Sequence, residues 1–236
     1  MSIERSRFRM SGRLLAEAAA IVGSILLAFA IDAWWDDRGA RQQEREAIRG
    51  LAADFEAASA ILSGDNLSVH DSAVAAAKAL LDLTGPGPTD VSSDSLARLI
   101  PAILRLPYFR PPLGTLDALI GSGQLSLIQN DSLRSALASF PSAVVDYNRT
   151  QGYSGDVVFG LVYPYLSERV PIREVGLYRN EGSGFTWDAR RLVGDLEFEN
   201  LVQTRLTNSR FAADEGLVMA ARIDQILSLL RNEMRK

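Results

Sequence analysis

The sequence has no cysteine and only one histidine, His70. The lack of cysteine excludes disulfide bonds, thiolate nucleophiles and cysteine-ligated metal sites. A single imidazole excludes histidine-rich metal sites and leaves none to spare for a Ser-His-Asp triad. His70 stands beside Asp71 at a predicted helix start, where we expect a solvated side chain rather than a catalytic one. We therefore expect no metal site, no cofactor and no catalytic residue.

Signatures of phosphate and nucleic-acid binding are missing as well. The turn Gly121-Ser122-Gly123 lacks the lysine and the remaining pattern of a P-loop or dinucleotide fingerprint, so it predicts a helix stop. The net charge is −4, but residues 1–13 alone carry +3, which leaves −7 on the rest of the chain. Phosphate binding relies on clustered lysine and arginine, so an acidic body argues against nucleic acid as a partner.

One long apolar segment is present near the start of the chain, in residues 14–35. No charged residue occurs from Ala18 to Ile31, and Trp34 and Trp35 follow where an interfacial aromatic belt is expected. A helix of this length measures about 33 Å, enough for the roughly 30 Å hydrocarbon core of a bilayer. Residues 14–35 are therefore predicted to form a transmembrane helix.

The flanking charges predict the orientation of this helix. Arginines precede it in residues 1–13, whereas Asp36 and Asp37 follow it directly. By the positive-inside rule, residues 1–13 form a cytoplasmic basic segment and residues 36–236 an extracytoplasmic domain. The expected location is the bacterial inner membrane, with the body of the protein in the periplasm.

Two other interpretations of the segment remain open. Ala28-Phe29-Ala30 matches the small-residue pattern of a signal-peptide cleavage site, and a cleaved signal would still export the body. The uncharged part is also short enough for a buried helix of a soluble protein.

Small residues repeat along one face of the segment. The face carries Ala16, Ala20, Ser24 and Ala28 at intervals of four, and Asp32 continues it. Such faces let helices approach closely in lipid, which predicts self-association, although alanine is common enough here for the repeat to arise by chance. Asp32 is either a hydrated boundary residue or a buried functional acid.

Most of the remaining chain is predicted to be helical. Apolar residues spaced by three and four predict long helices over 38–63, 66–83 and 195–234, with a stop at Gly64-Asp65 and a possible break near 208–213. Shorter helices are predicted over 94–106, 116–120 and from 131 onward, with Ser92 or Ser93, Thr115 and Asp131 as their respective N-caps. Residues 142–168 read as a helix with a strand-like alternative at 157–162. The predicted fold class is all-α, with a single N-terminal transmembrane helix that continues into a stalk, followed by an extracytoplasmic helical bundle whose first and last long helices pack together.

Two stretches together resemble a known protein family. Residues 25–38 form an apolar span with an aromatic and acidic end, and an amphipathic helix containing residues 51–54 follows it. Residues 115–134 comprise a short helix, a Ser-Gly, a Leu/Ile pair and a helix that opens with Leu-Arg. Both are similar to a family of uncharacterised bacterial single-span membrane-anchored proteins. The resemblance implies a membrane anchor and a helical extracytoplasmic part, but no activity. Where relatives usually place asparagines after the span, this chain has Asp32, Ala33 and Asp36.

A rigid loop offers the best candidate for a binding surface. Tyr108, Phe109 and Arg110 lie between prolines in residues 106–114, near Gln124 in the sequence. Aromatic residues and arginine dominate interface hot spots, so these four residues predict a partner-binding loop. The competing interpretation is that Tyr108 and Phe109 fill the core of the bundle.

The leading functional hypothesis is a non-enzymatic, membrane-anchored interaction or sensory protein that is oligomeric through its span and stalk. Its expected partners are the lipid bilayer, further copies of itself and an unknown membrane or envelope protein. One alternative is a carboxylate-dependent cell-envelope hydrolase. Another is an ion-conducting oligomer lined by Asp32.

Overall fold

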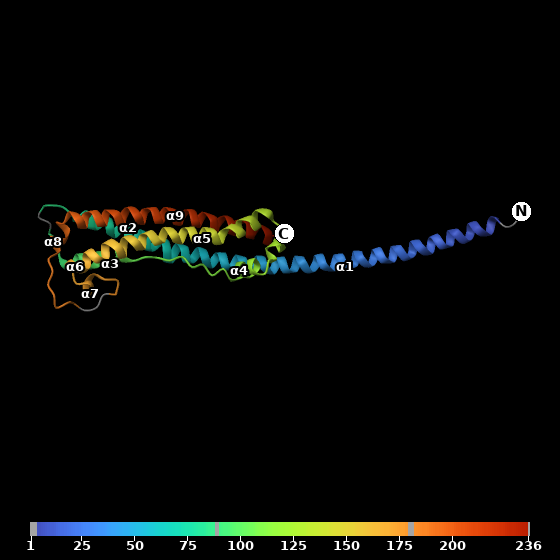
Figure 1. The fold of residues 1–236 in the computed structure, drawn as a ribbon, viewed down its shortest axis with the longest axis horizontal. Helices are drawn as coiled ribbons and strands as arrows, with labels where there is room; N and C mark the ends of the chain where they lie inside the picture. The colour runs from blue at the N-terminus through green and yellow to red at the C-terminus, as the bar shows by residue number, and fades with distance from the viewer. Residues whose placement is uncertain (1–3, 88–89, 179–181, 236) are drawn as a thin grey trace. The chain divides into compact units, whose positions relative to one another are not determined.

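The computed structural model describes residues 4–87, 90–178 and 182–235, with side chains from Ala16 onward. Every regular element within these ranges is helical and none is a strand, so the all-α prediction is confirmed (Figure 1). The predicted cytoplasmic segment covers residues 1–13. Its first three residues and all of its side chains lie outside the described part of the structure.

The elements follow one another as α1 (Glu4–Ile61), η1 (Leu62–Leu67), α2 (Ser68–Leu81), α3 (Ser93–Leu104), α4 (Gly114–Gly121), η2 (Gln124–Leu127), α5 (Asp131–Val157), η3 (Val158–Val162), α6 (Tyr163–Arg169), α7 (Ile172–Val175), α8 (Ala189–Val193) and α9 (Leu196–Met234). Both η1 and η3 are π-helical, whereas η2 is a 3₁₀-helix. The helical backbone runs without a break from α1 through η1 to the end of α2.

The chain divides into two units, residues 1–48 and 49–236. Taken by itself, the first unit is the N-terminal part of α1, and the apolar stretch that begins at Ala16 is long enough to cross a membrane. None of that stretch is buried within the described chain, and Leu26, Phe29 and Trp35 are each more than half exposed. The core helix of a soluble domain hides such side chains, so the exposure favours a membrane anchor or a signal sequence.

Polar contacts begin immediately after the apolar stretch. The rings of Trp34 and Trp35 meet edge-on with centroids 5.3 Å apart, and the Arg38 guanidinium lies 5.7 Å from the Trp34 centroid. One turn further, Asp37 pairs with Arg41 at 2.7 Å. Aromatic rings that adjoin charged groups are typical of the level where a bilayer meets water.

The second unit is a helical bundle. Helix α9 packs against both α2 and α5, and the three run side by side (Figure 1). The end of α1 contributes Phe55, whose ring meets that of Phe140 in α5 edge-on at 4.8 Å. Helix α9 packs against α2 and η1, which continue α1, whereas the expected packing of the helix over 38–63 against the last helix stays a prediction. Fully buried residues from all of these helices form the core, among them Leu51, Phe55, Leu80, Ile100, Phe140, Phe198, Val202, Ile223 and Leu230.

The predicted helix stop at Gly64-Asp65 is wrong. The π-helical segment η1 carries the chain through both residues into α2, with Leu62 and Asn66 buried on its inner side. A glycine inside a helix costs only about 1 kcal/mol, which the packing of its neighbours readily offsets. The predicted break in the last helix is absent for the same reason, because Ser209 and Ala212 of α9 are both fully buried.

Two of the predicted N-caps are also wrong. Helix α5 is capped by Asn130, whose side chain accepts a hydrogen bond from Leu133 N at 3.0 Å, and Asp131 is its first residue. Helix α4 begins at Gly114, and Thr115 N donates to Asp54 Oδ2 of α1 at 2.7 Å. The cap at Ser92 is confirmed by its bond from Ser95 N.

His70 is fully buried, so the prediction of a solvated side chain is wrong. It shares one face of α2 with Ala73, Ala77 and Leu80, all of which are fully buried. Spacings of three and four place these residues in register, and that face packs into the bundle. His70 therefore lies in the core because of its helical position, in spite of its charged neighbour Asp71.

A second ionisable side chain, Arg205 of α9, has no exposed surface. Its Nε and Nη2 donate to the backbone oxygens of Ile103 and Arg105 at 2.8 and 2.9 Å, and its Nη1 donates to Ser209 Oγ at 2.7 Å. No carboxylate pairs with it among the described residues, and burial lowers the pKa of Arg205 to about 10. The carbonyl oxygens at the C-terminal end of α3 are the negative end of a helix dipole, which partly offsets the cost of enclosing the cation.

We predict that Arg205→Ala lowers the free energy of unfolding of the full chain by roughly 3 kcal/mol, because it leaves buried acceptors without donors and opens a cavity. Urea denaturation followed by circular dichroism in detergent measures the change. The matched control is Arg210→Ala on the exposed side of the same helix, with an expected change within about 0.5 kcal/mol. Equal midpoints for the two variants would contradict the structural role of Arg205.

Candidate functional site

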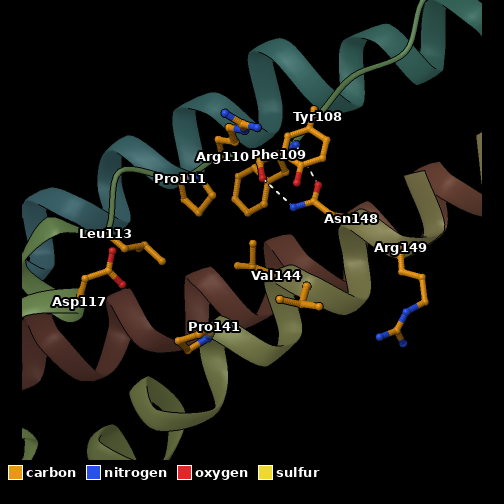
Figure 2. Close-up of a pocket in the computed structure, with 11 residues that line it drawn as sticks. Tyr108, Phe109, Arg110, Pro111, Leu113, Asp117, Pro141, Val144, Asn148 and Arg149 are labelled. Atoms are coloured by element: carbon orange, nitrogen blue, oxygen red, sulfur yellow. Dashed lines mark hydrogen bonds between the residues drawn. The ribbon is translucent and has the colours of Figure 1, made fainter. Parts of the chain in front are cut away.

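One groove of the second unit lies between the loop 105–113 and helix α5. It has a volume of about 670 Å³. Figure 2 shows Phe109 of the loop near Val144 and Asn148 of α5. The lining residues are Tyr108, Phe109, Arg110, Pro111, Leu113, Asp117, Pro141, Val144, Val145, Asn148 and Arg149. Most of these side chains are apolar, with two arginines and one aspartate among them.

One asparagine holds the loop against α5. Asn148 Nδ2 donates to Phe109 O at 2.9 Å, and Phe109 N donates to Asn148 Oδ1 at 3.1 Å (Figure 2). The Phe109 side chain is fully buried, and its ring meets Tyr147 edge-on with centroids 5.8 Å apart. Pro107, Pro111 and Pro112 restrict the backbone on either side to extended conformations. The groove is therefore formed before any partner binds.

The two neighbours of Phe109 face the opposite way. Successive side chains alternate along an extended backbone, so Tyr108 and Arg110 are exposed while Phe109 is buried. Tyr108 is 58% exposed, and the Arg110 guanidinium lies 4.9 Å from the centroid of its ring. The two sequence interpretations of this loop thus apply to different residues, because Phe109 fills the core and Tyr108 does not.

One of the two arginines of the groove is paired with an acidic side chain and the other is not. Arg149 pairs with Asp146 at 3.0 Å. Arg110 stacks on Tyr108, and no carboxylate of the described chain lies within 4 Å of it. Gln124 does not line this groove. It is an exposed residue of η2, and its side-chain oxygen accepts a hydrogen bond from Ser122 Oγ at 3.3 Å.

Buried polar side chains lie on α5, α2 and α9 beside the groove. His70 Nε2 lies 2.8 Å from Gln151 Oε1, and because a carbonyl oxygen only accepts, Nε2 carries the proton. The Ser154 hydroxyl, one turn further along α5, donates to Asn208 Oδ1 of α9. Several buried atoms have no hydrogen-bond partner in the described part of the chain, namely both amide atoms of Asn66, His70 Nδ1, Tyr147 Oη and Gln151 Nε2.

Burial sets the ionisation of this polar cluster. It lowers the pKa of His70, and the positive charge of Arg205 lowers it further, whereas the bond to Gln151 and the charge of Asp71 act in the opposite direction. Burial also raises the pKa of Tyr147, to about 12. Sequence reasoning missed the cluster, although the spacing of Tyr147, Gln151 and Ser154 by four and three places three polar residues on one helical face.

The predicted association face of the apolar segment has exposed side chains throughout. Ala16, Ala20, Ser24, Ala28 and Asp32 are all exposed within the described chain. Ser24 Oγ donates to Ile21 O at 2.7 Å, which satisfies the hydroxyl within its own helix. Self-association through this face stays a prediction.

A second cleft, of about 630 Å³, carries the acids that a hydrolase would need. Its lining includes Glu168, Asp188 and Asp195 together with Arg169 and Trp187. The Tyr165 hydroxyl donates to Asp195 Oδ2 at 2.7 Å, and this bond lowers the pKa of Asp195.

A general acid at neutral pH needs the opposite shift, a raised pKa. Asp195 instead acts as the N-cap of α9, accepting from Glu197 N at 2.9 Å. The carboxylate-dependent hydrolase therefore stays a prediction.

The chain matches no family model, no curated protein and no solved structure. The family resemblance of residues 25–54 and 115–134 therefore stays a prediction.

We predict that Asn148→Ala releases the loop, because it removes both hydrogen bonds to Phe109. The expected loss of stability is about 2 kcal/mol, roughly 1 for each bond, with faster hydrogen exchange at the Phe109 amide. Hydrogen exchange of the full chain measures this, and Asn200→Ala on the exposed face of α9 serves as the control. Unchanged protection of Phe109 in Asn148→Ala would show that other contacts hold the loop.

Proposed function

We propose that this protein is a membrane-anchored interaction protein of the bacterial envelope. Its second unit receives a segment of another envelope protein in the groove between the loop 105–113 and α5. The observation that carries the proposal is a preformed groove whose loop is fixed by Phe109 and Asn148 while Tyr108 and Arg110 remain exposed. Rigid aromatic and arginine side chains of this kind carry most of the binding energy at protein interfaces.

The chemistry of the groove selects an apolar segment that bears a carboxylate. Leu113, Val144 and Val145 supply an apolar surface between the two ends of the groove. Of the two arginines that line the groove, Arg110 is the one without a carboxylate partner in the described chain, and its planar guanidinium suits a bidentate contact. An acidic side chain within an apolar partner segment would supply the missing charge and bury the valines.

The exposed apolar stretch of α1 supports anchoring. Leaving it in water would be unfavourable at roughly 25 cal/mol per Å² of apolar surface, whereas lipid accommodates it. The arginines before it and Asp36 and Asp37 after it favour a cytoplasmic N-terminus and a periplasmic second unit in the inner membrane. Small residues on one face of the span, from Ala16 to Ala28, support self-association in the bilayer.

Site-specific photo-crosslinking in native membranes tests the docking. A photoreactive amino acid at Val145, which is 59% exposed in the groove, is expected to form an adduct with a different envelope protein. The matched control is Leu217 of α9, which is 60% exposed and does not line the groove. Arg110→Glu should abolish the Val145 adduct by charge repulsion, while Arg110→Lys retains part of it.

Three outcomes would contradict the proposal. Equal adducts from Val145 and Leu217 would indicate nonspecific contact. An adduct with a second copy of the same chain would make the groove a self-association surface. No adduct from Val145 in native membranes would leave the groove without the proposed partner.

A further inference from the structure

The groove and the single histidine of the chain are connected through one turn of α5. Gln151 Oε1 accepts the proton of His70 Nε2 at 2.8 Å. Tyr147 lies one turn before Gln151, and its ring contacts the ring of Phe109. The next residue, Asn148, forms hydrogen bonds with the backbone N–H and carbonyl of Phe109. The helical face that binds the histidine therefore also holds the loop.

The surroundings of His70 suit only its neutral form. From α9, Arg205 contributes a fully buried positive charge. From α5, Tyr147 is a neutral phenol whose pKa is raised further by burial, to about 12, and Gln151 is a neutral amide. The one charge that favours a protonated imidazole is Asp71 on the same helix, and α3, which also packs on α2, contributes none in the described chain.

A proton added at Nδ1 has no acceptor within hydrogen-bond distance in the described arrangement. That atom is buried and has no hydrogen-bond partner among the described residues. Protonation would place a second buried cation near Arg205, without a carboxylate to pair with either of them. Enclosing an unpaired charge is costly, so the charged histidine favours states in which α2 and α5 separate enough to admit water.

We propose that the groove is gated by pH through His70, so that the neutral histidine holds the loop 105–113 in its docking position and the charged histidine releases it. This inference rests on the docking function proposed above and adds its regulation. The direction follows from linkage. Folding lowers the pKa of His70 from its unfolded value of 6.5. The folded protein is therefore destabilised as the pH falls below 6.5, and its full stability is present above that value.

Hydrogen exchange of the full chain at pH 7.5 and 5.5 tests the gate, with rates corrected for the intrinsic effect of pH. The peptide that covers residues 106–113 should lose protection at the lower pH by up to about tenfold, the largest change that one histidine titrating at 6.5 in the released state can produce between these pH values. Two variants separate His70 from the other titrating groups. His70→Gln retains an amide donor for Gln151 but cannot be charged, so its loop protection should not depend on pH.

The second variant, Gln151→Glu, changes the expected effect of acid on the loop. It supplies a carboxylate to the charged histidine, so acid should no longer release the loop. This variant keeps the test decisive if circular dichroism shows that His70→Gln does not fold. An equal loss of protection at pH 5.5 in the wild type and in either folded variant would overturn the gate.

The crosslink from Val145 separates the gate from the docking function. An adduct that forms at pH 7.5 and weakens at pH 5.5 supports both. An adduct of equal yield at both values overturns the gate and leaves the docking function standing. If no adduct forms at pH 7.5, the docking function is wrong, and the exchange experiment still decides whether His70 controls the loop.

Discussion

The second unit is organised around a positive charge that no carboxylate of its described residues pairs with. Arg205 can remain buried only because two carbonyl oxygens at the end of α3 and one serine hydroxyl accept its protons. That requirement fixes where α3 ends against α9, and hence where the loop 105–113 begins. Burial lowers the pKa of His70, and the enclosed charge of Arg205 lowers it further. The position of the loop and its proposed control therefore both depend on which charges the bundle interior accepts.

Local features were predictable from the sequence. The apolar run of residues 14–35, the helical periodicity of the body, the Ser92 cap and the extended loop each depend on residues that are close together in the chain. Prolines at 107, 111 and 112 restrict the loop whatever surrounds it. The all-α fold and the position of the groove-forming loop followed from such signals, and the structure contains both.

Features that depend on tertiary packing could not be predicted in this way. Nothing near His70 in the sequence indicates burial, because Gln151 and Arg205 approach it only in the folded bundle. The same holds for Gly64, where packing carries the helix through a residue that usually ends one. Tyr108 and Phe109 are neighbours with opposite exposures, and Asn148, which bonds both backbone groups of Phe109, is distant in the sequence.

The central claim is that the bundle holds a neutral, proton-donating His70 beside the loop of the groove. Because the chain has one histidine, nitrogen-15 NMR of the labelled imidazole reports on this residue alone. The account predicts a neutral ring protonated at Nε2 and a pKa below the ordinary value of 6.5. A pKa at or above 6.5, or a neutral ring protonated at Nδ1, would contradict it.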